Sequence, residues 1–157
     1  MNKRVFGNTQ QKISEIGFGA ASISGEGGGY GFGAVSESDA IDIVKFCFEA
    51  GINLFDTAPI YGFGESEKRL GKALKGIRDQ VFLVSKSGVH WHSNKRVDMN
   101  NDPRIVEKML HQSLKDLQTD YIDLYMVHWP DQKWDIRHTL EPYANALEQH
   151  KIRFVGL

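Results

Sequence analysis

Apolar residues follow two different spacings along the chain, and their alternation predicts a repeating order of strands and helices. Short apolar runs typical of buried strands occur over residues 16–20, 52–56, 81–86, 121–128 and 152–157. Several runs, such as VFLV and LYMV, are continuous rather than alternating, which is typical of strands covered on both faces. The turn GNTQ separates RVF from KIS, so a short hairpin is expected over residues 3–14.

Helical spacing of apolar residues fills the intervals between the predicted strands. Helices are expected from Ser36 to Gly51, over residues 65–75, from Asp102 to about Leu117, and from Thr139 to about His150. Ser36 with Asp39 resembles a capping box, and Asp102–Pro103 is a cap followed by proline at the first helical position. Strands that alternate with helices in this way must be parallel and joined by crossovers.

The positions of polar residues choose between an open sheet and a closed barrel. Asp56, Lys86 and His128 each stand at the C-terminal end of a predicted strand. Those ends converge on one mouth in a (β/α) barrel, whereas only strands near the switch point share a crevice in an open sheet. The pattern therefore favours a barrel. No linker or charge block divides the chain, so residues 1–157 are expected to form part of one domain.

Composition narrows the function classes. The chain has 157 residues and a formal net charge of −1, which gives no electrostatic reason to bind nucleic acid or an anionic membrane. No apolar run is long enough to span a bilayer, and no secretory signal precedes the first strand. The single cysteine, Cys47, lies in a helical pattern and is expected to be a small buried hydrophobe, consistent with a cytoplasmic location.

Two motifs are expected to be less informative than they first look. The glycine-rich stretch over residues 25–33 contains G-x-G-x-x-A, but it begins well beyond the strand that a dinucleotide fingerprint should follow directly. We interpret it as a flexible loop at the barrel mouth. His90 and His92 have no third ligand at a clear spacing, so they are expected to be exposed loop residues and no metal site is predicted.

Four polar residues make chemical sense together. Each of Asp56, Tyr61, Lys86 and His128 has an ordinary structural role available on its own. At one mouth, an ammonium beside Tyr61 would stabilise the phenolate and lower the pKa of the phenol, while Asp56 would hold the lysine in place. His128 could orient a carbonyl oxygen. This set provides a proton donor for an oxygen on which negative charge builds, which suits reduction of a carbonyl by hydride.

These residues lie in segments that resemble the aldo-keto reductase family. The matching stretches are GINLFDTAPIYGFGESEKRLGKAL (51–74), VFLVSK (81–86), SLKDLQTDYIDLYMVHWPD (113–131) and KIRFVGL (151–157). GESE and HWPD are similar to bacterial oxidoreductases related to potassium-channel β subunits. The resemblance implies an α/β fold, a parallel (β/α)8 TIM barrel with an N-terminal hairpin, that reduces aldehydes and ketones with NADP(H). It leaves NAD(H) open.

The resemblance also implies roles for individual residues. Asp56, Tyr61, Lys86 and His128 match the family's catalytic tetrad, with Tyr61 as the general acid. Trp129 would join Tyr61 and His128 in binding a small carbonyl or sugar-like substrate. Asp56 and three residues at the end of the first strand would meet the cofactor, namely Gly19, Ala20 and Ala21. Many relatives carry threonine and an aromatic residue at the last two positions.

Length is the main departure from the family pattern. The chain supplies about five strands, whereas a complete barrel has eight. We therefore expect an N-terminal portion that is inactive alone, shows no saturable NADPH binding, and can self-associate through open strand edges. Two alternatives stay open. One is a non-catalytic binding or regulatory half barrel completed by a partner chain, and the other is a lyase or isomerase that uses the same residues.

Overall fold

The protein is built on one parallel five-stranded sheet. A computed structural model describes residues 1–25 and 28–157. The strands lie side by side in the order in which they occur in the chain: β3 (Phe18–Gly19), β4 (Leu54–Asp56), β5 (Phe82–Ser87), β8 (Ile122–Val127) and β9 (Ile152–Gly156). A doubly wound sheet would reverse direction at a switch point. The unbroken order instead matches consecutive strands of a (β/α)8 barrel, as the sequence predicted.

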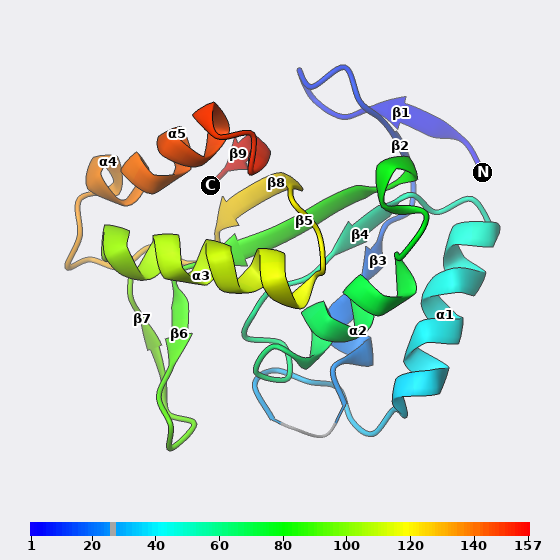
Figure 1. The fold of residues 1–157 in the computed structure, drawn as a ribbon, viewed down its shortest axis with the longest axis horizontal. Helices are drawn as coiled ribbons and strands as arrows, with labels where there is room; N and C mark the ends of the chain where they lie inside the picture. The colour runs from blue at the N-terminus through cyan, green and yellow to red at the C-terminus, as the bar shows by residue number, and fades with distance from the viewer. Residues whose placement is uncertain (26–27) are drawn as a thin grey trace.

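Helices cover one face of this sheet, as Figure 1 shows. They are α1 (Glu37–Glu49), α2 (Glu65–Ala73), α3 (Pro103–Asp116), α4 (Ile136–Thr139) and α5 (Glu141–Glu148), with short 3-10 turns η1 (Ala20–Ile23) and η2 (Arg78–Gln80). Ser36 and Asp102 cap α1 and α3 as expected, because each side chain accepts a hydrogen bond from a backbone N–H of the first turn. Within the described residues, no helix is long and apolar enough to cross a membrane.

The predicted start of the last helix at Thr139 is wrong. The chain becomes helical earlier, because Asp135 caps α4 by accepting a hydrogen bond from the N–H of Arg137. Thr139 is the last residue of α4 and is buried, with its hydroxyl donating to the carbonyl of Asn101 (3.1 Å). Threonine is a common N-cap residue, so the sequence alone did not distinguish a buried threonine from a helix cap.

Two hairpins lie at opposite ends of the sheet (Figure 1). The predicted N-terminal hairpin pairs β1 (Lys3–Val5) with β2 (Lys12–Ser14). The side chain of Asn53, just before β4, accepts from the N–H of Ser14 and donates to the carbonyl of Lys12, which fixes this hairpin at the N-terminal ends of the strands. The second hairpin, β6 (Val89–Trp91) with β7 (Val97–Met99), was expected to be a loop.

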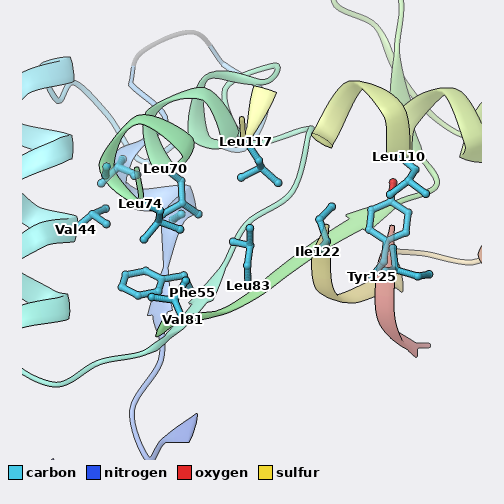
Figure 2. Packing of buried hydrophobic residues seen from close by; sticks show 14 of the residues in the cluster. Val44, Phe55, Leu70, Leu74, Val81, Leu83, Leu110, Leu117, Ile122 and Tyr125 are labelled. Atoms are coloured by element: carbon cyan, nitrogen blue, oxygen red, sulfur yellow. The ribbon is translucent and has the colours of Figure 1, made fainter. Parts of the chain in front are cut away.

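Side chains alternate between the two faces of the sheet, and this alternation separates two apolar clusters. Outward residues pack under the helices, as Figure 2 shows for a set that includes Phe55, Leu83 and Tyr125. Inward residues such as Val84 and Leu124 form the second cluster, and the hairpin residue Ile13 packs against it. Cys47 was expected to be buried but is only half-buried, packed at the edge of the outer cluster.

Candidate active site

Three polar residues continue the inward-facing rows of their strands. Asp56 follows Leu54 by two positions on β4, Lys86 follows Val84 on β5, and His128 follows Met126 just beyond β8. Leu54, Val84 and Met126 all belong to the inner cluster. Because side chains two positions apart share a face, the three polar residues point to the same side at the C-terminal ends of neighbouring strands.

Lys86 is held by two acceptors. Its Nζ donates to Oδ1 of Asp56 (2.6 Å) and to the carbonyl of Thr57 (2.8 Å). The lysine side chain is 12% exposed, whereas that of Asp56 is 42% exposed. The ammonium is therefore largely enclosed while the carboxylate faces the mouth. The predicted contact between Asp56 and Lys86 is present.

A glycine-dependent turn carries Tyr61 over this ion pair. The N–H of Gly62 donates to the carbonyl of Gly29 (2.9 Å), which ties the turn to the glycine-rich loop. Gly62 has φ +65, and a Cβ there would lie 2.5 Å from the carbonyl oxygen of Ser24. Only glycine fits both this backbone conformation and this close approach. Residues 26 and 27 of the same loop lie outside the described residues.

Tyr61 sits between the lysine and the histidine. Nζ of Lys86 is 5.3 Å from the centroid of the Tyr61 ring, and the ring of His128 meets it edge-on at a centroid distance of 5.8 Å. The four residues of the predicted tetrad are thus neighbours in space. The end-of-strand positions predicted this proximity, although 72 positions separate Asp56 from His128 (128 − 56).

The expected lowering of the Tyr61 pKa is not seen. Burial raises the pKa of the Tyr61 phenol above its usual value, and the negative charge of Asp56 raises it further. Burial of the ring and the Asp56 carboxylate thus outweigh the stabilisation of a phenolate that was expected from the Lys86 ammonium. The phenol therefore keeps its proton at neutral pH.

His128 is uncharged at neutral pH. Burial lowers its pKa to about 4, and the nearby Lys86 ammonium acts in the same direction against a smaller opposing effect of Asp56. A neutral imidazole carries one N–H donor and one acceptor nitrogen. The ring can therefore donate a hydrogen bond to a carbonyl oxygen without adding a positive charge.

A cavity of about 230 Å³ adjoins Tyr61 and His128. The other residues that line it are Ala21, Tyr30, Phe32, Val89 and Trp129. The Tyr30 and Trp129 rings meet edge-on at 6.1 Å. Trp129 was predicted at this place, while Tyr30, Phe32 and Val89 were missed. Two aromatic residues inside an otherwise small and polar glycine-rich loop were the available signal.

The three residues at the end of β3 differ in their surroundings. Gly19 is exposed, with open space where a Cβ would be, and Ala21 lines the cavity. Ala20 is fully buried, and its carbonyl accepts from the Ser66 hydroxyl (2.7 Å).

His90 lies on β6 and His92 directly follows it. No cluster of three potential metal ligands occurs in residues 1–25 and 28–157.

Comparison with known proteins identifies the family. The family model described as "Aldo/keto reductase family" matches residues 15–157. The chain belongs to the aldo/keto reductase family. It is 43% identical over 152 residues to the aldo-keto reductase YhdN of Bacillus subtilis, covering 96% of this chain and 44% of that protein.

Two solved family structures also resemble this chain. The holo form of the aldo-keto reductase AKR11C1 from Bacillus halodurans superposes with a TM-score of 0.88 and 33% identity, covering 99% of this chain and 49% of that one. An aldo/keto reductase from Klebsiella pneumoniae, solved with NADP and acetate, gives a TM-score of 0.79 and 27% identity, with coverage of 99% and 49%. The chain thus spans about half the length of the relatives it matches.

Proposed function

We propose that the protein reduces the carbonyl group of aldehydes or ketones with a nicotinamide cofactor, NADPH by analogy with the NADP-bound relative, and that Tyr61 is the general acid. The observation that carries this proposal is the convergence of Tyr61, Lys86 and His128 beside one cavity, with Asp56 bonded to the lysine. Membership of an oxidoreductase family supports the same reaction class.

The chemistry can be assigned to the side chains step by step. When bound, the cofactor supplies a hydride to the carbonyl carbon, so that a C–H bond forms and the carbonyl π electrons move to oxygen. Tyr61 gives its proton to that oxygen, which yields an alcohol and a phenolate. The ammonium of Lys86 lies where it lowers the energy of that phenolate. Because its pKa is raised, the Tyr61 phenol holds its proton at neutral pH and can serve as the donor.

Two further residues prepare the site. Asp56 keeps Lys86 under Tyr61, and neutral His128 donates a hydrogen bond to the carbonyl oxygen before the proton moves. At the end of β3, exposed Gly19 and the small side chain of Ala21 would help to hold the cofactor. Trp129, with Tyr30 and Phe32, offers an aromatic wall to the body of the substrate.

The proposal is tested with the protein as encoded in full by its gene. Consumption of NADPH is followed with a panel of small aldehydes, diketones and aldoses, for wild type and for Tyr61→Phe. Loss of the phenol proton should lower kcat by about 10² to 10⁴-fold while NADPH fluorescence titrations change little. Tyr121→Phe is the matched control, because Arg78 and Arg153 pack on that ring at the opposite end of β8. Equal loss of turnover and cofactor binding in Tyr61→Phe would contradict the assignment.

A further inference from the structure

Two buried polar side chains stand in the first turn of α2, behind the sheet. Ser66 and Glu67 are both completely inaccessible to solvent. The hydroxyl of Ser66 donates to the carbonyl of Ala20 (2.7 Å) and lies 2.9 Å from the hydroxyl of Thr57. Oε1 of Glu67 accepts a hydrogen bond from the hydroxyl of Ser85 (2.6 Å). Two consecutive residues of one helix thereby bind the C-terminal ends of β3, β4 and β5.

The residues held in this way are the chain neighbours of the ion pair. Thr57 follows Asp56, and the carbonyl of Thr57 is the second acceptor of the Lys86 ammonium. Ser85 directly precedes Lys86 on β5, so one side chain points out to Glu67 while the next points in to Asp56. A displacement of Ser85 or Thr57 therefore displaces the donor or an acceptor of the ion pair.

The buried carboxyl of Glu67 lowers the stability of the folded protein. Burial raises the pKa of Glu67 to about 7, with Asp116 on α3 adding to the rise and Lys86 and Ser85 opposing it. The hydroxyl of Ser113 also faces the carboxyl and lowers its pKa, although it lies outside hydrogen-bonding geometry. Oε2 of Glu67 and the hydroxyl of Tyr125 have no partner within the described residues. An apolar side chain would pack here without these penalties.

We propose that Glu67 is a positioning residue: its hydrogen bond to Ser85 fixes β5 from outside the barrel wall and so holds Lys86 against Asp56 and under Tyr61. Ser66 does the same for the end of β4 through Thr57. This inference rests on the proposed function, since it assigns Glu67 to the support of the proton donor. Glu67 does not line the cavity and makes no hydrogen bond to the ion pair, so we assign its positioning effect to the hydrogen bond from Ser85.

The test compares three variants in the protein as encoded in full by its gene. Glu67→Gln keeps an oxygen that accepts from Ser85, Glu67→Ala removes the acceptor, and Ser85→Ala removes the donor. Glu65→Gln is the control, because Glu65 lies in the same turn but pairs with Lys68 at the surface. Initial-rate assays, run well below each variant's melting temperature, give kcat and KM. NMR of ring-labelled tyrosine gives the Tyr61 pKa, and the Tyr61→Phe variant assigns the signal.

Glu67→Ala and Ser85→Ala should each lower kcat by about tenfold with KM little changed, and both should move the Tyr61 pKa. Glu67→Gln and Glu65→Gln should leave both quantities near wild type. A Glu67→Ala protein that melts earlier but keeps kcat and the Tyr61 pKa would overturn the inference, because the residue would then only stabilise the fold. The inference would also be overturned if Glu67→Gln behaved like Glu67→Ala, because the charge of Glu67 and not its hydrogen bond to Ser85 would then determine kcat and the Tyr61 pKa.

The two proposals can fail separately. If wild type reduces no carbonyl, the proposed function fails, and the Tyr61 titration alone then decides whether Glu67 positions the ion pair. If Glu67→Ala does not fold, Ser85→Ala tests the same hydrogen bond, because it removes only one hydroxyl from the buried strand.

Discussion

The ammonium of Lys86 lies over the face of the Tyr61 ring, with Nζ 5.3 Å from the ring centroid. The same nitrogen bonds to Asp56 and to the carbonyl of Thr57, so its direction is fixed by oxygen acceptors rather than by the phenol. The phenol is protonated at rest, and the ammonium already stands in place to stabilise a phenolate once the proton has left.

Lys86→Met should therefore affect the proton donor more than the fold. Without the ammonium, the Asp56 carboxylate still raises the Tyr61 pKa and nothing stabilises the phenolate. We expect kcat to fall by about 10² to 10³-fold, and the Tyr61 pKa to rise further. Steady-state kinetics and tyrosine NMR provide the measurements. Lys72→Met removes an exposed ion pair with Glu37 and should change neither. Near-normal turnover in Lys86→Met would rule out this role for the lysine.

The ring of His128 should be neutral throughout the physiological range. Its pKa in the folded protein is lowered to about 4 by burial and by Lys86, against an ordinary value of 6.5. Folding thus favours the neutral ring, so this contribution to stability is present above pH 6.5 and is lost as the pH falls toward 4. Imidazole NMR signals, assigned with His128→Gln, should show a midpoint near 4. A midpoint near 6.5 would mean that the ring is solvated and that its proposed role as a neutral donor is wrong.

Glu67 should make stability decrease as the pH rises. Its pKa in the folded protein is about 7, whereas its ordinary value is 4.5, so the folded state retains a proton that the unfolded state has lost. The contribution is full below pH 4.5 and is lost as the pH rises through 7. The free energy of unfolding, measured in urea, should differ between wild type and Glu67→Gln. This difference should change by about 3 kcal/mol across this pH range. A pH-independent difference would show that the carboxyl titrates normally.

The fold was predictable from sequence because its signals are local and repeated. Apolar runs marked the five strands, and Ser36 and Asp102 marked two helix starts through cap chemistry that involves only a few residues. The hairpin β6–β7 was missed because its strands are three residues long and lie in a polar stretch. Thr139 was misjudged because its burial depends on Asn101, which is 38 positions away.

The site was only partly predictable, for a related reason. The end-of-strand positions of Asp56, Lys86 and His128 carry information, since parallel strands bring those ends together. The direction of the Tyr61 pKa shift does not follow from residue types, because it depends on how deeply the ring is buried and on the Asp56 charge beside it. Glu67 lies in a helix whose other charged residues are exposed or only partly buried, and only the packing of α2 against β5 reveals that its carboxyl is enclosed.

The turn that carries Tyr61 depends on Gly62 for two reasons, a positive φ and a close approach to Ser24. Gly76 shares only the first, so comparing the two glycines separates these reasons. Gly62 and Gly76 both have positive φ, +65 and +85, but a Cβ on Gly62 would lie 2.5 Å from the Ser24 carbonyl, whereas a Cβ on Gly76 would meet open space. Gly76→Ala should therefore lower the free energy of unfolding by about 1 kcal/mol, through backbone strain only. Gly62→Ala should lower it by about 1 to 3 kcal/mol more. Because Gly62 also bonds to Gly29, its substitution should displace Tyr61 and lower kcat/KM, while Gly76→Ala should leave kcat/KM unchanged. Chemical unfolding and steady-state kinetics of both variants check this, and equal costs in the pair would mean that the approach to Ser24 does not constrain the turn.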